Sequence, residues 1–583
     1  MKLKKRILPF YQAIPKLLAF QVVSELLLSL ITFAVSALSS MLLGLTGKAA
    51  ITSGNIGIMF TRWEGYAIIV LTLLMVLAYV AVELNALIIY CSKLIVGENP
   101  SVWRCIGEGF AGLKKYLNLR GLIIVIYASV LAPILGLGFS ISMTSTFYVP
   151  RFIMSVINAN PLFSTGYFIV MALLTVVAFV YSFILHGALV DNMTMKEASV
   201  NSRKLVKRNF KNYIFELFCY AVIMVLVFAV LFLIAVIPLL IVRNIAMGES
   251  AQIFWNILLT IIPIAVVLFA SLMAVSFLIL KVSMLYKKYT TEGEWSYQPR
   301  EKKHHPFVIA AAILVLLLCV GISAIGTYNF DEAFHTKITT EVIAHRAGGV
   351  EAPENTVKGI ETAVELGAKG CEIDIQRTKD GYYIVNHDAD FARTAGVSKT
   401  PGEMTLEEVK ELRVDGEPVP TLEEMLDASK DKAVLFVELK GESADNQMAD
   451  DAVRIIKEKG MEDQAVLISL KYDVLEYVEQ NYPEMLTGYL AFISFGQIED
   501  TPFDYLALEE EISTDENIDA IHEKGKMVMV WTVNEEDDIE DFMTGDADAI
   551  ITDSVKLAGE IKEQLSRRSP SEIIAQQLST MIQ

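Results

Sequence analysis

The chain has 583 residues, of which 53% are hydrophobic, and its mean hydropathy is +0.45. That length exceeds one ordinary domain, and that hydropathy excludes a purely water-soluble protein, so part of the chain lies in a membrane. The formal net charge of −19 argues against a nucleic-acid partner, since binding to a polyphosphate backbone depends on clustered Lys and Arg. Five cysteines without any CxxC spacing predict neither a zinc site nor a disulfide framework.

The apolar residues are concentrated in the first part of the chain. Long uncharged runs fill the region before about Phe330, whereas the remainder carries dense Asp, Glu and Lys. This shift predicts a membrane domain at 1–330, a soluble domain at 340–565 and a C-terminal tail at 566–583. A helix needs about 20 apolar residues to cross the hydrocarbon core of a bilayer. Segments that meet this criterion predict an α-helical polytopic domain with about seven transmembrane helices, at 18–45, 66–90, 121–142, 166–188, 214–242, 253–283 and 306–327.

Basic residues are concentrated in alternate loops between these segments. Lys and Arg are frequent in the stretches that would lie on one side of the membrane, which are 2–6, 93–120, 196–211 and 287–303. The intervening loops hold only Lys48 and Arg62, then Arg151, then Arg243. Because short cytoplasmic loops are enriched in Lys and Arg, this pattern predicts a multi-pass cell-membrane protein with a cytoplasmic N-terminus and an extracellular soluble domain. One helix more or fewer would invert that orientation.

The soluble part alternates between two kinds of segment. From Glu341 onward, short β-rich runs alternate with amphipathic helical stretches, which is typical of a parallel sheet built from βαβ units. Roughly eight such repeats in over 200 residues predict a (β/α)8 TIM barrel. The predicted strands are 342–347, 372–377, 382–387, 434–439, 465–469, 486–491, 505–508, 527–532 and 549–552. The predicted helices are 356–366, 405–412, 421–428, 445–459, 472–481, 514–524 and 535–544.

Carboxylates occur on one face of two predicted strands. Glu372 and Asp374 alternate in the run CEIDIQ, and Glu438 precedes Lys440 by two residues in VLFVELK. Residues i and i+2 of a strand share a face, so we expect these side chains to point into the barrel mouth. Converging carboxylates repel one another unless a cation joins them, and all-oxygen ligation suits Mg²⁺ or Ca²⁺. Structural salt bridges are the alternative interpretation.

Histidines follow two of the predicted strands. His345 and Arg346 end the first strand in IAHRAGG, and His387 ends another in IVNHD. Two histidines supply a base for the nucleophile and an acid for the leaving oxygen of a phosphoryl reaction, but the sequence does not decide which is which. Arg346 and Lys440 supply positive charge for phosphate oxygens. Taken singly, each histidine has a structural interpretation too, and His522, on a predicted helix, is interpreted as a surface residue.

Six motifs occur in a fixed order along the soluble part: AHRAGGVEAPENT, GCEIDIQRTKDG, VNHDADFARTAG, VELKGE, VWTVN and IITD. The ordered set closely resembles the glycerophosphodiester phosphodiesterases over nearly the whole soluble domain. The resemblance implies a TIM barrel that hydrolyses glycerophosphodiesters to glycerol 3-phosphate and an alcohol with one divalent cation. The multi-helix N-terminal half resembles the membrane domain fused to such enzymes in some Gram-positive bacteria.

The resemblance also implies which residues form the active site. The cation, Mg²⁺ or Ca²⁺, would be held by Glu372, Asp374 and Glu438. The other roles would fall to polar residues near the strand ends: His345 and His387 as the acid–base pair, Arg346 and Lys440 on the phosphate, Trp531 at the substrate mouth, and Glu354 and Asn355 ordering the first loop.

We therefore expect a membrane-anchored enzyme that hydrolyses glycerophosphodiesters on the extracytoplasmic face. Its partners would be a small glycerophosphodiester or lipid-derived substrate and the lipid bilayer, with no nucleic acid. One alternative is phospholipase-like hydrolysis of intact membrane lipid or of a glycerol-phosphate polymer. The other is a transporter or sensor whose barrel binds phosphodiesters.

Overall fold

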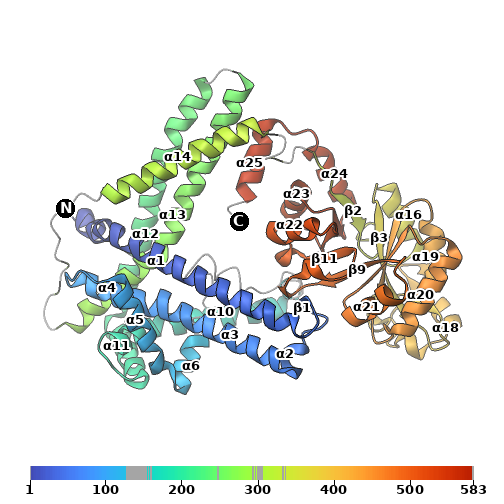
Figure 1. Cartoon of the computed structure of the whole chain (residues 1–583), viewed down its shortest axis with the longest axis horizontal. Coiled ribbons are helices and arrows are strands. Elements are labelled where there is room, and N and C mark those ends of the chain that lie inside the picture. Colours follow the sequence, from blue (N-terminus) through green and yellow to red (C-terminus); the bar gives the residue numbers. More distant parts are fainter. Residues whose placement is uncertain are drawn as a thin grey trace. The chain divides into compact units, whose positions relative to one another are not determined.

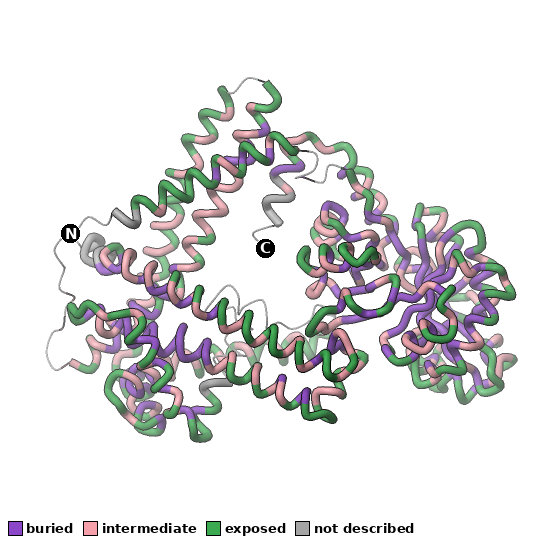
Figure 2. The backbone as a smooth tube through the Cα atoms, viewed as in Figure 1, coloured by how far each residue is buried: buried purple, intermediate pink, exposed green. Residues whose placement is uncertain are grey.

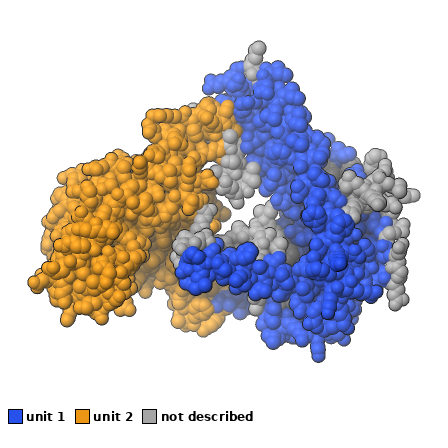
Figure 3. Space-filling model, turned by 180° about the vertical axis from the view of Figure 1, so that it is seen from behind, with its two compact units in different colours: residues 1–38, 69–330, 581–583 blue, residues 39–68, 331–580 orange. Residues whose placement is uncertain are grey.

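The structure, a computed structural model, shows a helical part and an α/β part (Figure 1). It describes residues 2–126, 154, 157, 160–245, 248–291, 295, 297, 306–330, 334 and 337–580. Contacts divide the chain into two compact units, one of residues 1–38, 69–330 and 581–583 and the other of residues 39–68 and 331–580 (Figure 3). The second unit therefore contains a short segment from the membrane part of the sequence.

The first unit is helical. Its helices are α1 (Lys2–Gly44), α3 (Trp63–Tyr79), the π-helix η1 (Val80–Ala86), α4 (Leu87–Ile95), α5 (Val102–Gly112), the 3-10 helix η2 (Leu113–Tyr116), α6 (Leu119–Ile126), α10 (Pro161–Tyr181), α11 (Ile184–Leu189), α12 (Met195–Ile245), α13 (Glu249–Thr290) and α14 (Pro306–Tyr328). Large apolar side chains along α12 and α14 are exposed, such as Leu226 and Leu316 (Figure 2). Exposed apolar surface on helices of this length is what a bilayer covers.

Six helical segments among the described residues are long and apolar enough to cross a membrane: Pro9–Gly44, Trp63–Ile95, Pro161–Leu189, Met195–Ile245, Glu249–Thr290 and Ile309–Tyr328. They match six of the predicted spans and confirm a multi-pass helical membrane part. The remaining predicted span, 121–142, lies outside the described residues except at its start in α6.

The second unit contains a closed parallel barrel. Its strands, in spatial order, are β2 (Glu341–Ala344), β3 (Gly370–Arg377), β7 (Val434–Leu439), β8 (Ala465–Ser469), β9 (Leu486–Ala491), β11 (Tyr505–Glu509), β12 (Met527–Trp531) and β13 (Ala549–Thr552). The sheet closes because β13 pairs with β2. The predicted TIM barrel is therefore confirmed. The predicted strand 382–387 became β4 (Tyr383–Val385), which pairs antiparallel with β3 and is not part of the barrel wall.

Helices follow most of the barrel strands. They are α16 (Val357–Glu365), α19 (Leu422–Ser429), α20 (Asn446–Lys459), α21 (Tyr472–Asn481), α22 (Asp515–Glu523), α23 (Glu536–Thr544) and α24 (Val555–Leu565). Shorter elements are α17 (Ala392–Ala395), η4 (Pro401–Glu403), α18 (Leu406–Lys410), β5 (Arg413–Val414), β6 (Glu417–Pro418), η5 (Ile498–Asp500) and η6 (Glu510–Ile512). The final helix is α25 (Pro570–Thr580). Side-chain caps such as Thr356 and Asp445 begin these helices by accepting backbone N–H bonds.

Successive side chains along each barrel strand point to opposite faces and form two apolar layers. One set of side chains, including Phe436, Ile468 and Leu490, fills the barrel interior. The other set, including Leu435 and Leu467, packs against the surrounding helices. This division follows from the period of two along a strand, and it leaves the ends of the strands for polar residues.

A segment from between the first two membrane spans joins the second unit. Residues 50–52 form β1 (Ala50–Thr52), which pairs antiparallel with β10 (Ser494–Gly496), and α2 (Ile58–Thr61) follows. The strand β10 comes directly after β9 in the chain. Ala50 is fully buried within the apolar layer outside the barrel wall.

Candidate active site

Three carboxylates meet at the carboxyl ends of β3 and β7. Asp374 lies directly opposite Glu438 in the parallel register of these strands, and Glu372 precedes Asp374 by two residues on the same face. All three side chains are buried, and one oxygen of each lies within 4.8 Å of the others. The structure thus brings together the residues that the sequence predicts as a cluster.

Lysine and asparagine side chains contact this cluster. The ammonium of Lys440 donates to Asp374 Oδ1 at 2.7 Å and to Glu438 Oε2 at 3.0 Å. The amide of Asn355 donates to Asp374 Oδ2 at 2.8 Å. One lysine therefore stands against three buried carboxylates in this part of the described chain.

The protonation of the cluster reflects that imbalance. Burial, together with the charges of Asp374 and Glu438, raises the pKa of Glu372 well above its usual range. Burial also raises the pKa of Glu438 to about 7, although Lys440 opposes the change. Burial alone would raise the pKa of Asp374, but Lys440 and the hydrogen bond from Asn355 help to hold it well below its usual value. A cluster of carboxylate oxygens with excess negative charge suits a hard divalent cation such as Mg²⁺ or Ca²⁺.

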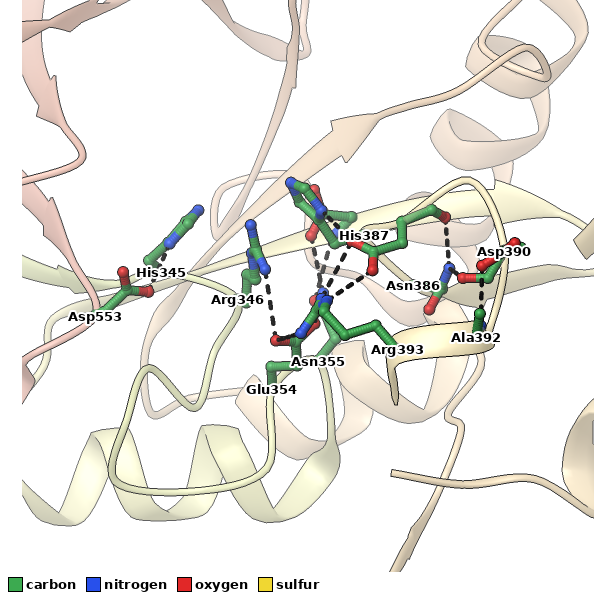
Figure 4. Close-up of polar contacts among 12 residues, drawn as sticks. His345, Arg346, Glu354, Asn355, Asn386, His387, Asp390, Ala392, Arg393 and Asp553 are labelled. Atoms are coloured by element: carbon green, nitrogen blue, oxygen red, sulfur yellow. Dashed lines mark hydrogen bonds and ion pairs between the residues drawn. The ribbon is translucent and has the colours of Figure 1, made fainter. Parts of the chain in front are cut away.

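His345 is held by a carboxylate on the neighbouring strand of the barrel. It follows β2, and its Nδ1 lies 2.7 Å from Oδ1 of Asp553, which follows β13 (Figure 4). Asn534 fixes that aspartate, because its amide donates to Asp553 Oδ2 at 2.7 Å and its carbonyl accepts from the Asp553 N–H at 2.8 Å. Neither Asp553 nor Asn534 was assigned a role from sequence, although both lie in the quoted motifs IITD and VWTVN.

His387 has a similar partner with an additional cation. Its Nδ1 lies 2.9 Å from Oδ1 of Asp388, whose Oδ2 accepts from Arg393 Nε at 2.7 Å. The bond from Arg393, with that from His387, lowers the pKa of Asp388 to about 2. Burial is the main cause that lowers the pKa of His387, which keeps this ring neutral near pH 7. Asp388 ends the motif IVNHD and Arg393 lies in the motif VNHDADFARTAG, but neither was assigned a role from the sequence.

The loop after β2 brings Arg346 beside the cluster. Arg346, Ala347 and Asn355 have positive φ values of 50°, 58° and 56°, and the Asn355 N–H donates to the Arg346 carbonyl at 2.6 Å. The Arg346 N–H donates to Glu372 Oε2 at 2.8 Å. Non-glycine residues in this region are strained, and such strain is concentrated at functional sites. The loop is thereby fixed against β3.

The guanidinium of Arg346 has unused hydrogen-bonding capacity within the described chain. Its Nη1 contacts Glu354 Oε2 at 3.4 Å, whereas its buried Nε has no hydrogen-bond partner among the described residues. Glu354 is bound more closely by Arg393, at 2.6 and 2.9 Å. Figure 4 shows the Arg346 side chain between His345 and His387. A buried guanidinium donor at this place is suited to an oxyanion.

Trp531 and His522 lie at opposite ends of the barrel. Trp531 ends β12, and its indole N–H donates to the carbonyl of Ala507 on β11 at 2.8 Å, which fixes the ring at the carboxyl end of the strands. His522 lies on α22 and pairs with Asp548 at 2.9 Å, just before β13. Asp548 is at the amino end of that strand, away from the carboxylate cluster.

A closed (β/α)8 barrel with a carboxylate cluster, two His–Asp pairs and an arginine at the ends of its strands has the architecture of a TIM-barrel phosphodiesterase. Residues 3–324 match the family described as the membrane domain of glycerophosphoryl diester phosphodiesterase, and residues 345–557 match the glycerophosphoryl diester phosphodiesterase family. The chain belongs to this family, and it is a glycerophosphodiester phosphodiesterase with a membrane domain. The family, the fold and the enzyme class predicted from the motifs are confirmed.

Individual relatives align with the barrel over most of their own length. The glycerophosphodiester phosphodiesterase of Caldanaerobacter subterraneus subsp. tengcongensis is 32% identical over 233 residues, which are 37% of this chain and 94% of the relative. That of Bacillus altitudinis is 27% identical over 249 residues, which are 39% of this chain and 99% of the relative. A crystal structure of a glycerophosphodiester phosphodiesterase from Parabacteroides distasonis is similar at 26% identity and a TM-score of 0.36, covering 39% of this chain and 98% of that one.

Cation binding at the cluster is expected to strengthen as the pH rises through about 7. The pKa of Glu438 is raised from 4.5 to about 7, so at lower pH a proton competes with the cation for this carboxylate. The cation-free chain should lose stability as the pH rises from about 4.5 to about 7, because over this range the folded state holds a proton on Glu438 that the unfolded state has released. The shift in Tm produced by Mg²⁺, Ca²⁺ or Mn²⁺, measured at several pH values, tests both statements.

The matched variants for this measurement are two glutamates of the same barrel. Glu438→Gln should abolish the cation-induced shift in Tm at every pH. Glu361→Gln, at an exposed position of α16, should leave the shift unchanged. An undiminished shift in Glu438→Gln would show that the cation binds elsewhere.

Asp553→Asn is expected to lower kcat by about 100- to 10,000-fold with a smaller change in KM, because His345 loses the carboxylate that fixes its tautomer. Steady-state kinetics of glycerophosphodiester hydrolysis measure the split between kcat and KM. Asp548→Asn is the control, since it alters a third His–Asp pair, with His522, at the opposite end of the barrel. Equal losses in the two variants would contradict a positioning role for Asp553.

Proposed function

We propose that this enzyme hydrolyses glycerophosphodiesters to glycerol 3-phosphate and an alcohol, with a divalent cation and two histidines, on the extracytoplasmic face of the membrane. The observation that carries the proposal is the arrangement at one end of the barrel. Two histidines, each bonded to its own aspartate, flank an arginine beside three clustered carboxylates. This combination supports phosphodiester hydrolysis better than binding alone, because a binding protein needs no pair of positioned proton carriers.

The carboxylate cluster is proposed to hold the cation. Glu372, Asp374 and Glu438 would be its ligands, and Mg²⁺ and Ca²⁺ both accept such oxygen donors. When bound, the cation supplies positive charge that polarises a phosphoryl oxygen. Lys440, which contacts two of the ligands, would keep a positive charge beside the phosphate.

The two histidines are proposed to move protons. Each ring bonds its aspartate through Nδ1, so Nε2 is the atom left to face a reacting oxygen. One Nε2 takes a proton from water, and the other gives a proton to the leaving alcohol. Asp553 and Asp388 hold the rings in the orientation that both steps need.

Arg346 is proposed to bind the phosphate. Its backbone is fixed by contacts to Glu372 and Asn355, and its buried Nε remains available for a phosphate oxygen. A guanidinium fits a phosphate through several parallel hydrogen bonds. Trp531, held by Ala507, would form the apolar wall of the substrate mouth, and Glu354, held by Arg393, would keep the loop in place.

The outward orientation of the barrel is part of the proposal. The basic N-terminus and the alternation of basic loops support it. The pairing of β1 with β10 adds an independent argument, because it requires the loop after the first span to lie on the same side as the barrel. An even number of crossings must then separate them. After the first span, the six spans among the described residues leave five further crossings, which is an odd number. The seven predicted spans leave six, which is the even number that the pairing requires.

The full-length enzyme is expected to release glycerol 3-phosphate from glycerophosphocholine or glycerophosphoglycerol when Mg²⁺ or Ca²⁺ is present. His345→Ala and His387→Ala should each lower kcat by about 100-fold or more, because each removes a proton carrier. The control is His522→Ala, which should keep full activity. Phospholipid vesicles offered in place of the soluble diesters show whether intact lipid is a substrate. Absence of product with every diester and both cations would refute the proposal.

The orientation is expected to appear in thiol labelling of intact cells. Lys556→Cys, at an exposed position of α24, should react with a membrane-impermeant maleimide without permeabilisation. Arg104→Cys, at an exposed position of α5 in a predicted cytoplasmic loop, should react only after permeabilisation. The reverse pattern would place the barrel in the cytoplasm.

A further inference from the structure

The segment between the first two membrane spans contacts the barrel through its backbone. We name residues 48–55 the docking segment. Its β1 pairs with β10 in an antiparallel register that places Ile51 opposite Phe495, and the Gln497 N–H donates to the Ala49 carbonyl at 3.2 Å. The strand β10 would otherwise be a short edge with unpaired backbone groups. The docking segment therefore supplies hydrogen bonds that this loop of the barrel needs.

Side chains anchor both ends of the docking segment. Lys48 donates to both oxygens of Glu476 at 2.8 and 2.9 Å, and its ammonium lies 4.1 Å from the centre of the Tyr472 ring. Only 18% of the Lys48 side chain is exposed. The Thr52 hydroxyl bonds to the Tyr489 hydroxyl, and both residues are fully buried. A buried hydroxyl pair and a cation stacked on an aromatic ring indicate a specific, ordered interface.

Two glycines allow the close approach of the two backbones. A Cβ at Gly54 would lie 2.3 Å from the carbonyl oxygen of Leu470. Gly496 has a φ of 105°, and a Cβ there would lie 2.8 Å from the carbonyl oxygen of Ala49. Each glycine stands on a different side of the interface, so the fit depends on both partners.

The docking segment meets the barrel at its catalytic end. Leu470 directly follows β8, and β10 follows β9, so the contacts lie beyond the carboxyl ends of these strands. The strand β8 pairs with β7, and Ile468 of β8 lies opposite Glu438. The contacted part of the rim is therefore one strand away from the proposed cation ligand.

The docking segment is also close to the membrane spans along the chain. Lys48 follows the end of α1 at Gly44 by four residues, which span at most about 14 Å when fully extended. Its attachment to Glu476 therefore ties α21 to a point of the chain that is no farther than this from the end of the first span.

We propose that residues 48–55 of the first inter-span loop form a permanent docking surface for the catalytic barrel, which completes the rim of the active site beside β8 and β9 and holds it near the bilayer. The partner of this surface is the barrel of the same chain. The contact is a fixed part of the working enzyme, and it does not depend on the identity of the substrate.

Disulfide cross-linking of the full-length protein in membranes tests the docking. Cross-strand partners have Cα atoms about 4.5–5.5 Å apart, which a disulfide spans. The variant Ile51→Cys/Phe495→Cys also receives a protease site after the exposed Lys337, so that an intramolecular disulfide keeps the two fragments together after cleavage. With a mild oxidant, we expect nearly complete retention that reducing agent reverses. The control pair Ile51→Cys/Lys556→Cys should give separate fragments.

Charge reversal provides the second variant series. Lys48→Glu should slow disulfide formation several-fold, and the addition of Glu476→Lys should restore the rate. Lys358→Glu, which alters an ion pair with Glu361 on α16, should have no effect. The uncleaved, oxidised enzyme should hydrolyse a soluble glycerophosphodiester at the same rate as its reduced form.

Three results would overturn the docking proposal: no disulfide in a variant that is active when reduced, no rescue by Glu476→Lys, or loss of activity on oxidation. Inactivity of every reduced form with normal cross-linking would instead count against the proposed hydrolysis and leave the docking supported.

Discussion

Burial of three carboxylates within 4.8 Å of one another is the constraint around which the barrel's polar residues are arranged. Like charges in a poorly solvated place repel, and one lysine does not neutralise them. Burial and this repulsion raise the pKa of Glu372 well above its usual range. The parallel register that sets Asp374 opposite Glu438 imposes this proximity, so the fold itself produces a cluster of oxygen donors suited to a divalent cation.

Hydrogen bonds from neighbouring residues hold the two histidines and the Arg346 loop around this cluster. Asp553 bonds His345 and the amide of Asn534, whereas Asp388 bonds His387 and the guanidinium of Arg393. The two rings thus share a type of partner but differ in their electrostatic surroundings. The strained loop that carries Arg346 is held by backbone and side-chain hydrogen bonds to β3, which offsets the cost of its positive φ values.

Much of the barrel and of the carboxylate cluster could be predicted from the sequence, because a period of two along a strand determines which residues share a face. The convergence of Glu372, Asp374 and Glu438 follows from that rule and from the parallel order of the strands. Asp553 and Asn534 escaped prediction because their roles depend on how the loops after β12 and β13 meet the loop after β2, which is distant in the sequence. The sequence placed Lys440 on the same face as Glu438, but its hydrogen bonds to both Asp374 and Glu438 depend on side-chain rotamers.

The docking segment shows a second limit of sequence reasoning. Thr52 and Tyr489 are 437 residues apart, and β1 has only three residues, which is too short for a pattern to be recognised. The strand 382–387 was predicted from its local sequence pattern. Its antiparallel pairing with β3 depends instead on the turn between the two strands. Pairing between segments is a tertiary property, so local propensity does not determine it.

The most direct test of the cation site is a structure of the enzyme with Mn²⁺, in which anomalous scattering locates the ion. We expect one ion at about 2.0–2.4 Å from oxygens of Glu372, Asp374 and Glu438, near His345 and His387. This prediction would be contradicted if the ion bound elsewhere while the three carboxylates remained paired only with Lys440.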